Sequence, residues 1–427
     1  MKIHFIGIGG IGVSALAQYY LAKGHKISGS DLASSEITDF LKEKGVTIII
    51  GPHLEKNITE DIDMVIYSPA VQKDNPEYKK AKEFQIGLKS YPEALGALTK
   101  EYYTIAVSGA HGKSTTTAMV ALVLIKAGLD PAVIVGTRLK EFGFSNFRKG
   151  SSKYLVIEAC EYDDSFTNYF PKITVVTNVD KEHLDYFKTF ANVIKTFKNF
   201  ISKLPPKGFL VANRDDKNLV KISKGEFTTR YYSIKDKEVA KVKKILKIPG
   251  DHNVSNALAV LAVARILQIK DTITFKALSE YMGSWRRFEI IKTKPYTLIS
   301  DYAHHPSEIY ATLKAAREKY PKLKIWLIFQ PHQYQRTYYL FKDFIKVFRQ
   351  VPIDNIIITD IYDVAGREEK KISTSTSSEN LVKKINRKNI TYMPISSAEK
   401  FVKENIKSGG VIIIMGAGDI YKLVDKF

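Results

Sequence analysis

The chain has 427 residues, which is too long for one core of ordinary size, so two or three domains are expected. Hydrophobic residues make up 44% and charged residues 26%, a balance that is typical of globular proteins and argues against disordered and fibrous classes. The formal net charge is +20, but the lysines are scattered from Lys2 to Lys426 without an arginine-rich block, which favours a solvated surface over nucleic-acid binding.

The sequence carries no signal for export or for insertion into a membrane. Residues 1–10 lead directly into an apolar strand pattern, without the basic, apolar and small-residue segments of a signal peptide. No apolar run approaches the ~20 residues that a bilayer crossing needs. The single cysteine, Cys160, cannot form an internal disulfide and is expected to be a buried small side chain. We therefore expect a cytoplasmic protein without a membrane partner.

Strand-like runs alternate with helical periodicity from the first residue, which predicts an α/β protein with parallel sheets covered by helices. In the first part of the chain, a helix is predicted at 11–23, and the predicted strands are 2–8, 26–30, 47–50 and 64–67. The pattern loosens through residues 73–99. We take this loosening as a boundary and predict a first, Rossmann-like domain over residues 1–99.

A second domain is predicted over residues 100–287 and a third, Rossmann-like domain over residues 288–427. The second begins with a strand, a glycine loop and a helix, and its predicted elements are strands 103–108, 154–157 and 174–177 and helices 114–127, 253–267 and 275–281. The predicted strands of the third are 297–300, 324–329, 355–359 and 411–415. Residues 366–378, rich in charge, Ser and Thr, predict a surface loop.

The first glycine loop, GIGGIG, lies between a predicted strand and a predicted helix. This spacing lets a backbone approach a diphosphate at a helix N-terminus, and Asp31 at the end of the second strand is placed to meet a ribose hydroxyl. The residues expected to bind the nucleotide are Gly9, Gly10, Ile11, Gly12 and Asp31. Because any nucleoside diphosphate fits this loop, a UDP-type nucleotide and a nicotinamide cofactor both stay open at this point.

The second glycine loop follows strand 103–108 and opens a helix, which is typical of a phosphate cradle. Lys113 would reach the outer phosphates, and the Ser114 hydroxyl would bind magnesium. Val107 stands where the usual pattern has glycine, so the loop is a shorter variant. The residues expected to bind a nucleoside triphosphate are Gly109, Ala110, His111, Gly112, Lys113, Ser114 and Thr115. A second nucleotide loop favours a nucleotide-linked substrate, rather than a redox cofactor, on the first.

Two further residues are candidates for binding magnesium. Glu158 directly follows a predicted strand, a position from which a carboxylate reaches the metal beside a phosphate loop. His183 emerges after strand 174–177, near the carboxyl edge of the sheet, where ligands of such sheets bind. We expect Glu158 to bind one magnesium ion together with Ser114, and His183 to bind a second.

Nine stretches of the sequence, in order, resemble the Mur ligase family of peptidoglycan synthesis, and most closely its alanine-adding branch. They are GIGGIGVSALA with GSD, SGAHGKSTTTAM, EACEYDDSF, VTNVDKEHLDYF, GDHNVSNALAV, RRFE, DYAHHPSEI, FQPHQYQRT and DIYDVAGREE. The resemblance implies an N-terminal domain for a UDP-sugar, a central ATPase domain and a C-terminal domain for the amino acid. It also implies that ATP phosphorylates the lactyl carboxylate of UDP-N-acetylmuramate, and that L-alanine attacks the acyl phosphate.

The resemblance also assigns roles to individual residues. Asn253 would hold adenine, and Arg287 and Asp301 would contact ATP. His304, His305 and Arg336 would face the acyl phosphate and the amino acid. The UDP-sugar pocket would include Ser68, Pro69 and Ala70. The catalytic set is then Lys113, Glu158, His183, His304 and Arg336, with ATP and Mg²⁺ as cofactors.

The sequence departs from the family pattern at two positions. Gln333 stands where some members have arginine, which leaves the identity of the amino acid less constrained, and Phe197 takes the place of a lysine that other Mur ligases carbamylate. The runner-up within the family is the ligase that attaches a whole tripeptide to the same sugar. A nicotinamide-dependent oxidoreductase and a catalytically dead nucleotide-binding module are the alternatives from other classes. The expected oligomeric state is a monomer or a weak homodimer.

Overall fold

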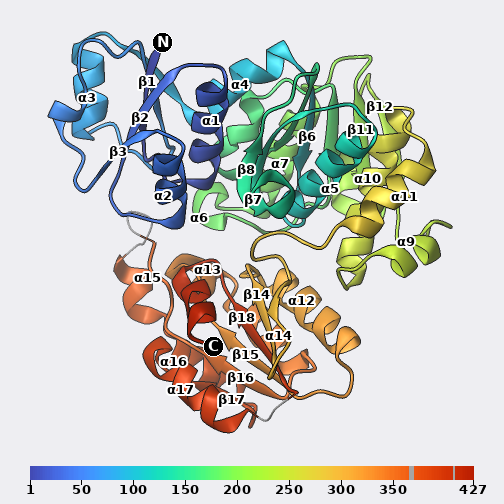
Figure 1. Ribbon diagram of the computed structural model, residues 1–427. Coiled ribbons are helices and arrows are strands. Elements are labelled where there is room, and N and C mark those ends of the chain that lie inside the picture. The colour runs from blue at the N-terminus through green and yellow to red at the C-terminus, as the bar shows by residue number, and fades with distance from the viewer. Residues whose placement is uncertain (365–369, 407–408) are drawn as a thin grey trace. The chain divides into compact units, whose positions relative to one another are not determined.

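The computed structural model describes residues 1–364, 370–406 and 409–427, which fold into two compact units (Figure 1). Unit 1 comprises Met1–Val179, Ile194–Ser233 and Ala257–Leu278, and unit 2 comprises Asp180–Val193, Ile234–Asn256 and Ser279–Phe427. None of the helices within the described ranges has the length and hydropathy that crossing a bilayer requires.

The first sheet of unit 1 has five parallel strands in the order β3-β2-β1-β4-β5. The order reverses between β1 and β4, and open α/β sheets bind ligands at the carboxyl ends of the strands beside such a reversal. The strands are β1 (Lys2–Ile6), β2 (Lys26–Asp31), β3 (Thr47–Ile50), β4 (Met64–Tyr67) and β5 (Gly87–Ser90). The helices are α1 (Ile11–Ala22), α2 (Glu36–Glu43), η1 (Glu55–Asn57), α3 (Pro76–Glu83) and α4 (Tyr91–Glu101).

The region where the sequence pattern loosens, 73–99, is in fact regular structure. It forms α3, β5 and the first part of α4. Helix α3 buries only Glu77 and Ala81, so it carries little apolar periodicity. Its start is marked instead by the Asn75 side chain, which accepts hydrogen bonds from two backbone N–H groups, and α4 starts with a capping box at Ser90.

The second sheet of unit 1 has seven strands in the order β12-β11-β10-β6-β9-β7-β8, all parallel except β8. The strands are β6 (Tyr103–Ser108), β7 (Ala132–Leu139), β8 (Ser145–Arg148), β9 (Tyr154–Glu158), β10 (Ile173–Val176), β11 (Phe209–Asn213) and β12 (Thr228–Tyr232). The helices of this region of the chain are α5 (Lys113–Lys126), η2 (Lys140–Phe142), η3 (Tyr162–Asn168), α6 (Leu184–Phe187), α7 (Phe190–Ile201), α8 (Lys217–Ile222), α9 (Val239–Ile245), α10 (Asp251–Ile266) and α11 (Asp271–Glu280). Strand β6 is buried along almost its whole length, which places the loop that follows it at the centre of the sheet edge.

A buried polar network joins the two α/β folds of unit 1, where α1 packs against the hairpin of β7 and β8 (Figure 1). Asn146 of β8 donates through Nδ2 to the Ile11 carbonyl oxygen and, at 2.9 Å, to Ser14 Oγ. Gln18 donates to Asn146 Oδ1 at 2.8 Å and accepts from Ser145 Oγ at 2.8 Å. The first turn of α1 is therefore fixed to the second sheet by hydrogen bonds as well as by packing.

The third sheet, in unit 2, has the order β13-β14-β18-β15-β16-β17, and only β13 runs antiparallel. Alternate residues of β18 enter two separate cores: Val411, Ile413 and Met415 enter one, and Ile412 and Ile414 the other. The strand is therefore buried on both faces. The strands are β13 (Glu289–Lys292), β14 (Thr297–Asp301), β15 (Ile325–Phe329), β16 (Asn355–Ile358), β17 (Ile390–Tyr392) and β18 (Val411–Met415). The helices are α12 (Pro306–Lys319), α13 (Tyr334–Tyr339), α14 (Phe341–Gln350), α15 (Lys370–Ser375), α16 (Ser378–Ile385), α17 (Ile395–Asn405) and η4 (Asp419–Lys426).

Two expectations from the sequence are wrong. The predicted loop at 366–378 contains helix α15, because Ile372 is buried and anchors the segment despite its Ser and Thr content. Residues 365–369, which also end the stretch DIYDVAGREE, lie outside the described residues. Cys160 is exposed rather than buried, since it follows the end of β9 and leaves the sheet.

Candidate active site

The first glycine loop leaves the carboxyl end of β1 and leads into the N-terminus of α1. Gly7 and Ile8 donate through N–H to the Ser30 carbonyl oxygen at 2.9 and 3.0 Å, which closes the turn against β2. Helix α1 begins after Gly10 without a side-chain cap and without an acidic residue in its first turn. An uncapped helix N-terminus presents N–H groups and a positive dipole to an anion. The loop therefore fits a diphosphate.

The other residues predicted for this site lie at the same edge of the first sheet. Asp31 ends β2 and accepts a hydrogen bond from Gly9 N–H at 2.8 Å. Ser68, Pro69 and Ala70 follow β4, and a Cβ placed on Gly7 would lie 3.0 Å from Ser68 Cβ. The structure thus gathers these predicted residues around one turn. It also shows that the Asp31 carboxylate supports the loop itself.

The phosphate loop follows β6 and is held in shape by the loop after β10. His111 donates through N–H to Asn178 Oδ1 at 2.9 Å, and its carbonyl oxygen accepts from Thr177 Oγ1 at 2.5 Å. Gly109 has a φ of +130°, and a Cβ there would lie 2.0 Å from Thr177 Oγ1, so only glycine fits. Helix α5 begins at Lys113 without a side-chain cap, which leaves its first N–H groups to an anion.

Lys113 lies inside this loop and pairs with a carboxylate that the sequence did not single out. Its Nζ is 3.0 Å from Glu161 Oε2, and it donates to the Gly109 carbonyl oxygen at 2.6 Å. Burial alone would lower the pKa of Lys113, but Glu161 and neighbouring acidic groups outweigh burial and raise the pKa. The ammonium group is therefore charged at neutral pH. Glu161 belongs to EACEYDDSF, a run of acidic residues that ordinarily indicates a solvated surface.

Ser114 and Glu158 form a pair of hard oxygen donors beside Lys113. Ser114 Oγ donates to Glu158 Oε1 at 3.1 Å, and Gly136 N–H donates to Glu158 Oε2 at 2.8 Å. A Cβ on Gly136 would lie 2.6 Å from that carboxylate, so the glycine lets β7 approach it. Hydroxyl and carboxylate oxygens are ligands that Mg²⁺ prefers, and they adjoin a phosphate loop. The pair therefore fits a magnesium ion.

Unit 2 gathers other predicted residues around Glu182, which is 4% exposed. Arg336 NH2 is 3.4 Å from Glu182 Oε2, and His304 Nε2 is 4.0 Å from Glu182 Oε1. Burial alone would raise the pKa of Glu182, but Arg336 and the neighbouring histidines lower it well below its usual range. Burial lowers the pKa of His304 to about 4, so its imidazole is neutral at physiological pH. Sequence reasoning missed Glu182, although it precedes His183 directly.

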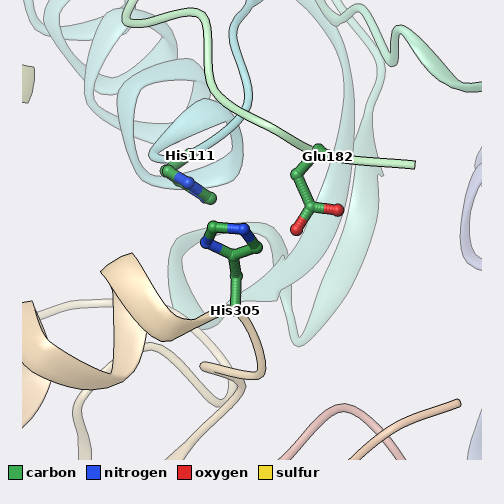
Figure 2. A group of neighbouring side chains, drawn as sticks. All are labelled: His111, Glu182 and His305. Carbon is green, nitrogen blue, oxygen red and sulfur yellow. The ribbon is translucent and has the colours of Figure 1, made fainter. Parts of the chain in front are cut away.

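His305 is the N-terminal cap of α12, and Figure 2 shows its ring turned toward the Glu182 carboxylate. Its Nδ1 accepts from Ser307 N–H at 3.3 Å, so its Nε2 carries the proton and donates to the Lys181 carbonyl oxygen at 3.2 Å. His305 therefore fixes the segment that carries Glu182 and His183 to the start of α12.

His183 has a φ of +53° and lies in the turn that begins α6. It lines a small pocket of unit 2 together with Lys181, Glu182, Leu184, Asp185, Arg336, Tyr339 and Leu340. His183 therefore belongs to unit 2, whereas Ser114 and Glu158 belong to unit 1.

The other three residues predicted to contact ATP each interact with neighbouring groups of the protein. Asn253 lies in the first turn of α10, where its Nδ2 donates to the Pro249 carbonyl oxygen at 2.7 Å. Asp301 accepts from Phe288 N–H at 2.7 Å and Ala303 N–H at 2.9 Å, and burial raises its pKa. The Arg287 guanidinium lies 4.6 Å from the centre of the Tyr302 ring.

Phe197 is fully buried and packs edge to face on Phe166, with ring centres 5.3 Å apart. The side chain at this position is therefore part of the core.

Three sequence models of one family match the chain in order. They are the Mur ligase family catalytic domain at residues 2–103, the Mur ligase middle domain at residues 107–245 and the Mur ligase glutamate ligase domain at residues 286–418. The chain is 41% identical over 455 residues to the UDP-N-acetylmuramate–L-alanine ligase of Caldanaerobacter subterraneus subsp. tengcongensis, a match that covers 100% of this chain and 97% of that protein.

Solved structures with similar names share the fold. The UDP-N-acetylmuramate–alanine ligase of Thermotoga maritima is 28% identical with a TM-score of 0.83, and the match covers 100% of this chain and 98% of that one. A murein peptide ligase of Psychrobacter arcticus, 22% identical with a TM-score of 0.74 and the same coverage, shares the fold. The two nucleotide loops, the three sheets and these matches along the whole length lead to one conclusion: the chain belongs to the Mur ligase family.

Proposed function

We propose that this protein joins L-alanine to the lactyl carboxylate of UDP-N-acetylmuramate in the cytoplasm, with ATP as the energy source, as a step of peptidoglycan precursor synthesis. The observation that carries the proposal is that unit 1 contains two glycine loops, and that each of them leads into a helix whose N-terminus has no side-chain cap. One fits a diphosphate, and the other carries the Lys113 ammonium and the Ser114–Glu158 oxygen pair. The names of the full-length relatives support L-alanine as the amino acid.

In this proposal the residues of unit 1 hold the two phosphate-bearing substrates. The loop from Gly9 to Gly12, at the N-terminus of α1, would bind the diphosphate of the sugar nucleotide, with Asp31 and the Ser68–Ala70 turn beside it. The loop from Gly109 to Thr115 would bind the phosphates of ATP, where Lys113 offsets the charge on the transferred group. Ser114 and Glu158, with His183 for a second ion, would hold magnesium, which neutralises phosphate charge when bound.

The residues of unit 2 would complete the reaction. Asn253, Arg287 and Asp301 would contact ATP, while His304, His305 and Arg336 would face the acyl phosphate and the amino acid. A guanidinium binds a carboxylate through parallel hydrogen bonds, so Arg336 suits the carboxylate of L-alanine. The corresponding domains would be residues 1–99 for the UDP-sugar, 100–287 for ATP and 288–427 for the amino acid. The protein would act as a monomer or a weak homodimer, without nucleic acid.

The chemistry proceeds in two steps. An oxygen of the lactyl carboxylate attacks the γ-phosphorus of ATP, and the bond to the β-phosphate oxygen breaks, which releases ADP. The amine nitrogen of L-alanine then attacks the carbonyl carbon of the acyl phosphate. The carbon–oxygen bond to the phosphate breaks, inorganic phosphate leaves, and the nitrogen gives up a proton to solvent. Phosphorylation is needed because a free carboxylate has no adequate leaving group.

The test is an assay of the purified protein with ATP, magnesium and UDP-N-acetylmuramate. The amine donors are L-alanine, glycine, L-serine and the tripeptide. Phosphate release that requires both the sugar nucleotide and L-alanine, with the amide product identified by mass spectrometry, is the expected result. Product formed only with the tripeptide would favour the recycling ligase instead. Hydride transfer to a nicotinamide cofactor without ATP would overturn the ligase assignment.

A further inference from the structure

Tyr91 covers the start of α1. It is the first residue of α4, directly after β5, at the carboxyl edge of the first sheet. A Cβ placed on Gly12 would lie 2.7 Å from Tyr91 Cζ and 2.8 Å from its hydroxyl oxygen, so a larger residue there would displace the end of the ring. Glycine at position 12 therefore lets the phenol ring pack directly on the start of α1. This packing also fixes where the hydroxyl lies.

The same phenol also faces the part of unit 1 that carries Ser114 and Glu158. Helix α4, which Tyr91 begins, contacts β6 and η3, the 3-10 helix that follows β9, so Tyr91 lies on the side of the first glycine loop that faces the second sheet. Burial raises the pKa of the Tyr91 hydroxyl, and the negative charge of Glu158 raises it further. The hydroxyl therefore keeps its proton at any physiological pH and is a hydrogen-bond donor.

The Tyr91 hydroxyl makes no hydrogen bond with any residue that the structure describes, and the side chain is partly exposed. The two Glu158 oxygens already accept hydrogen bonds from Ser114 Oγ and Gly136 N–H. Tyr19 in the same unit behaves differently, since its hydroxyl is 3.0 Å from that of Tyr102. Tyr91 thus offers a fixed donor to a ligand.

Building on the proposed function, we propose that Tyr91 is a further catalytic residue, whose hydroxyl donates a hydrogen bond to the lactyl carboxylate that accepts the phosphoryl group. A substrate with its diphosphate on the first glycine loop and its carboxylate beside Ser114 and Glu158 must pass Tyr91. A neutral donor suits this role, because it orients one carboxylate oxygen while the other keeps its negative charge for attack on phosphorus.

The test compares two sugar nucleotides by calorimetry in the absence of ATP. UDP-N-acetylmuramate carries the lactyl carboxylate, and UDP-N-acetylglucosamine lacks it. The Tyr91→Phe variant keeps the ring over Gly12, so the loop should keep its shape. We expect the variant to bind UDP-N-acetylmuramate about 10-fold more weakly, the loss of one hydrogen bond to a charged group, and UDP-N-acetylglucosamine within about twofold of the unchanged protein. A matched control is Tyr154→Phe, which removes a hydroxyl elsewhere in unit 1 and should change neither affinity.

Equal affinities of Tyr91→Phe and the unchanged protein for UDP-N-acetylmuramate would overturn the proposal. A parallel loss of affinity for both sugar nucleotides would also overturn it, because the ring would then act on the loop rather than on the carboxylate. If the unchanged protein bound neither sugar nucleotide, the proposed function itself would fail. That result is distinct from a failure of Tyr91 alone.

Discussion

The ion pair of Lys113 and Glu161 gives Lys113 two roles. Its positive charge suits phosphate binding, and the pair also stabilises the fold. Glu161 is fully buried, and its carboxylate holds the Lys113 ammonium group in the phosphate loop. Removing one member of a buried pair costs about 3 kcal/mol or more, because the other charge stays buried without its partner. Loss of activity in a Lys113 variant therefore has two possible causes, lost catalysis and lost stability.

Two variants separate these causes. Lys113→Met should lower phosphate release at least about 100-fold, the usual cost of losing a group that stabilises transition-state charge, and should lower the melting temperature. The double variant Lys113→Met with Glu161→Gln should regain stability without regaining activity. UDP-N-acetylmuramate binding should stay within about twofold of the unchanged protein in both. Lys172→Met, an exposed substitution in the same unit, is the control. Recovery of activity in the double variant would show that Lys113 has only a structural role.

Among the elements, the hydrogen-bond network between α1 and β8 connects the first glycine loop to the hairpin that also contacts Glu158. Asn146 is 3% exposed and bonds to Ile11, while β7, the partner of β8, supplies the Gly136 N–H that holds Glu158. The hairpin of β7 and β8 thus contacts both the start of α1 and the Glu158 carboxylate.

Replacing Asn146 should therefore raise the KM for the sugar nucleotide but not the KM for ATP. Asn146→Leu, similar in volume, should raise the KM for UDP-N-acetylmuramate about 10-fold and leave the KM for ATP within about twofold, because only the α1 loop loses its hydrogen bonds. Steady-state kinetics with each substrate varied in turn gives both values. Ser145→Ala, which removes a bond to Gln18 but none to Ile11, is the matched control. A lower melting temperature with an unchanged KM would show that the network only stabilises the fold.

Helix α3 is attached to the first sheet through Glu77, which is 0% exposed. Burial alone would raise the pKa of Glu77, but hydrogen bonds with His4, Ser30 and Asn57 outweigh burial and lower the pKa to about 2. In the unfolded chain a glutamate titrates at about 4.3. The folded state therefore binds this proton less tightly. The resulting stabilisation is present above pH about 4.3 and is lost as the pH falls toward 2.

The Glu77→Gln variant tests this contribution. At pH 7 it should be less stable than the unchanged protein by about 3 kcal/mol, the equivalent of the shift in pKa, and the difference should shrink steadily between pH 5 and pH 2. Thermal unfolding at a series of pH values measures it. Glu83→Gln, an exposed change on the same helix, should produce no such trend. A difference in stability that did not vary with pH would contradict the assigned titration.

Much of the fold can be predicted from the sequence where strands are apolar along their length. The strands at 47–50, 64–67, 103–108 and 411–415 have the predicted bounds, because Ile- and Val-rich runs end at polar residues. Strand β8 was missed, since its buried residues include Ser145 and Asn146, whose partner Gln18 lies more than 100 residues away. The motifs bring Ser114 and Glu158 together as predicted. Glu161 and Glu182 were not singled out, because burial of an acidic residue is decided by tertiary contacts.

At the scale of the whole molecule, the chain is interleaved. Six consecutive segments alternate between the units, so the chain passes from one unit to the other five times. Two short segments of unit 2, Asp180–Val193 and Ile234–Asn256, interrupt unit 1 in the sequence. Leu184 in the first of them packs against the core of the third sheet.

In a fragment that ends at residue 278, two segments should therefore lack their packing partners. The fragment would contain all of unit 1, but the two short segments would lack the residues 279–427 against which they pack. We expect limited proteolysis to cut the fragment first within 180–193 and 234–256, whereas the full chain resists cleavage there under the same conditions. Mass spectrometry of the products locates the cuts. Equal resistance in the fragment would mean that unit 1 alone orders these segments.

The interleaving also has a consequence for synthesis on the ribosome. The stretch that carries Glu182, His183 and Leu184 emerges early, yet the core on which Leu184 rests is among the last parts translated. Until then an apolar side chain and a glutamate that is buried in the final fold remain exposed to water and to other nascent chains. Residues 180–193 therefore cannot complete their packing until the C-terminal part of the chain has been synthesised. During this interval the nascent chain is most open to aggregation and to binding by a chaperone.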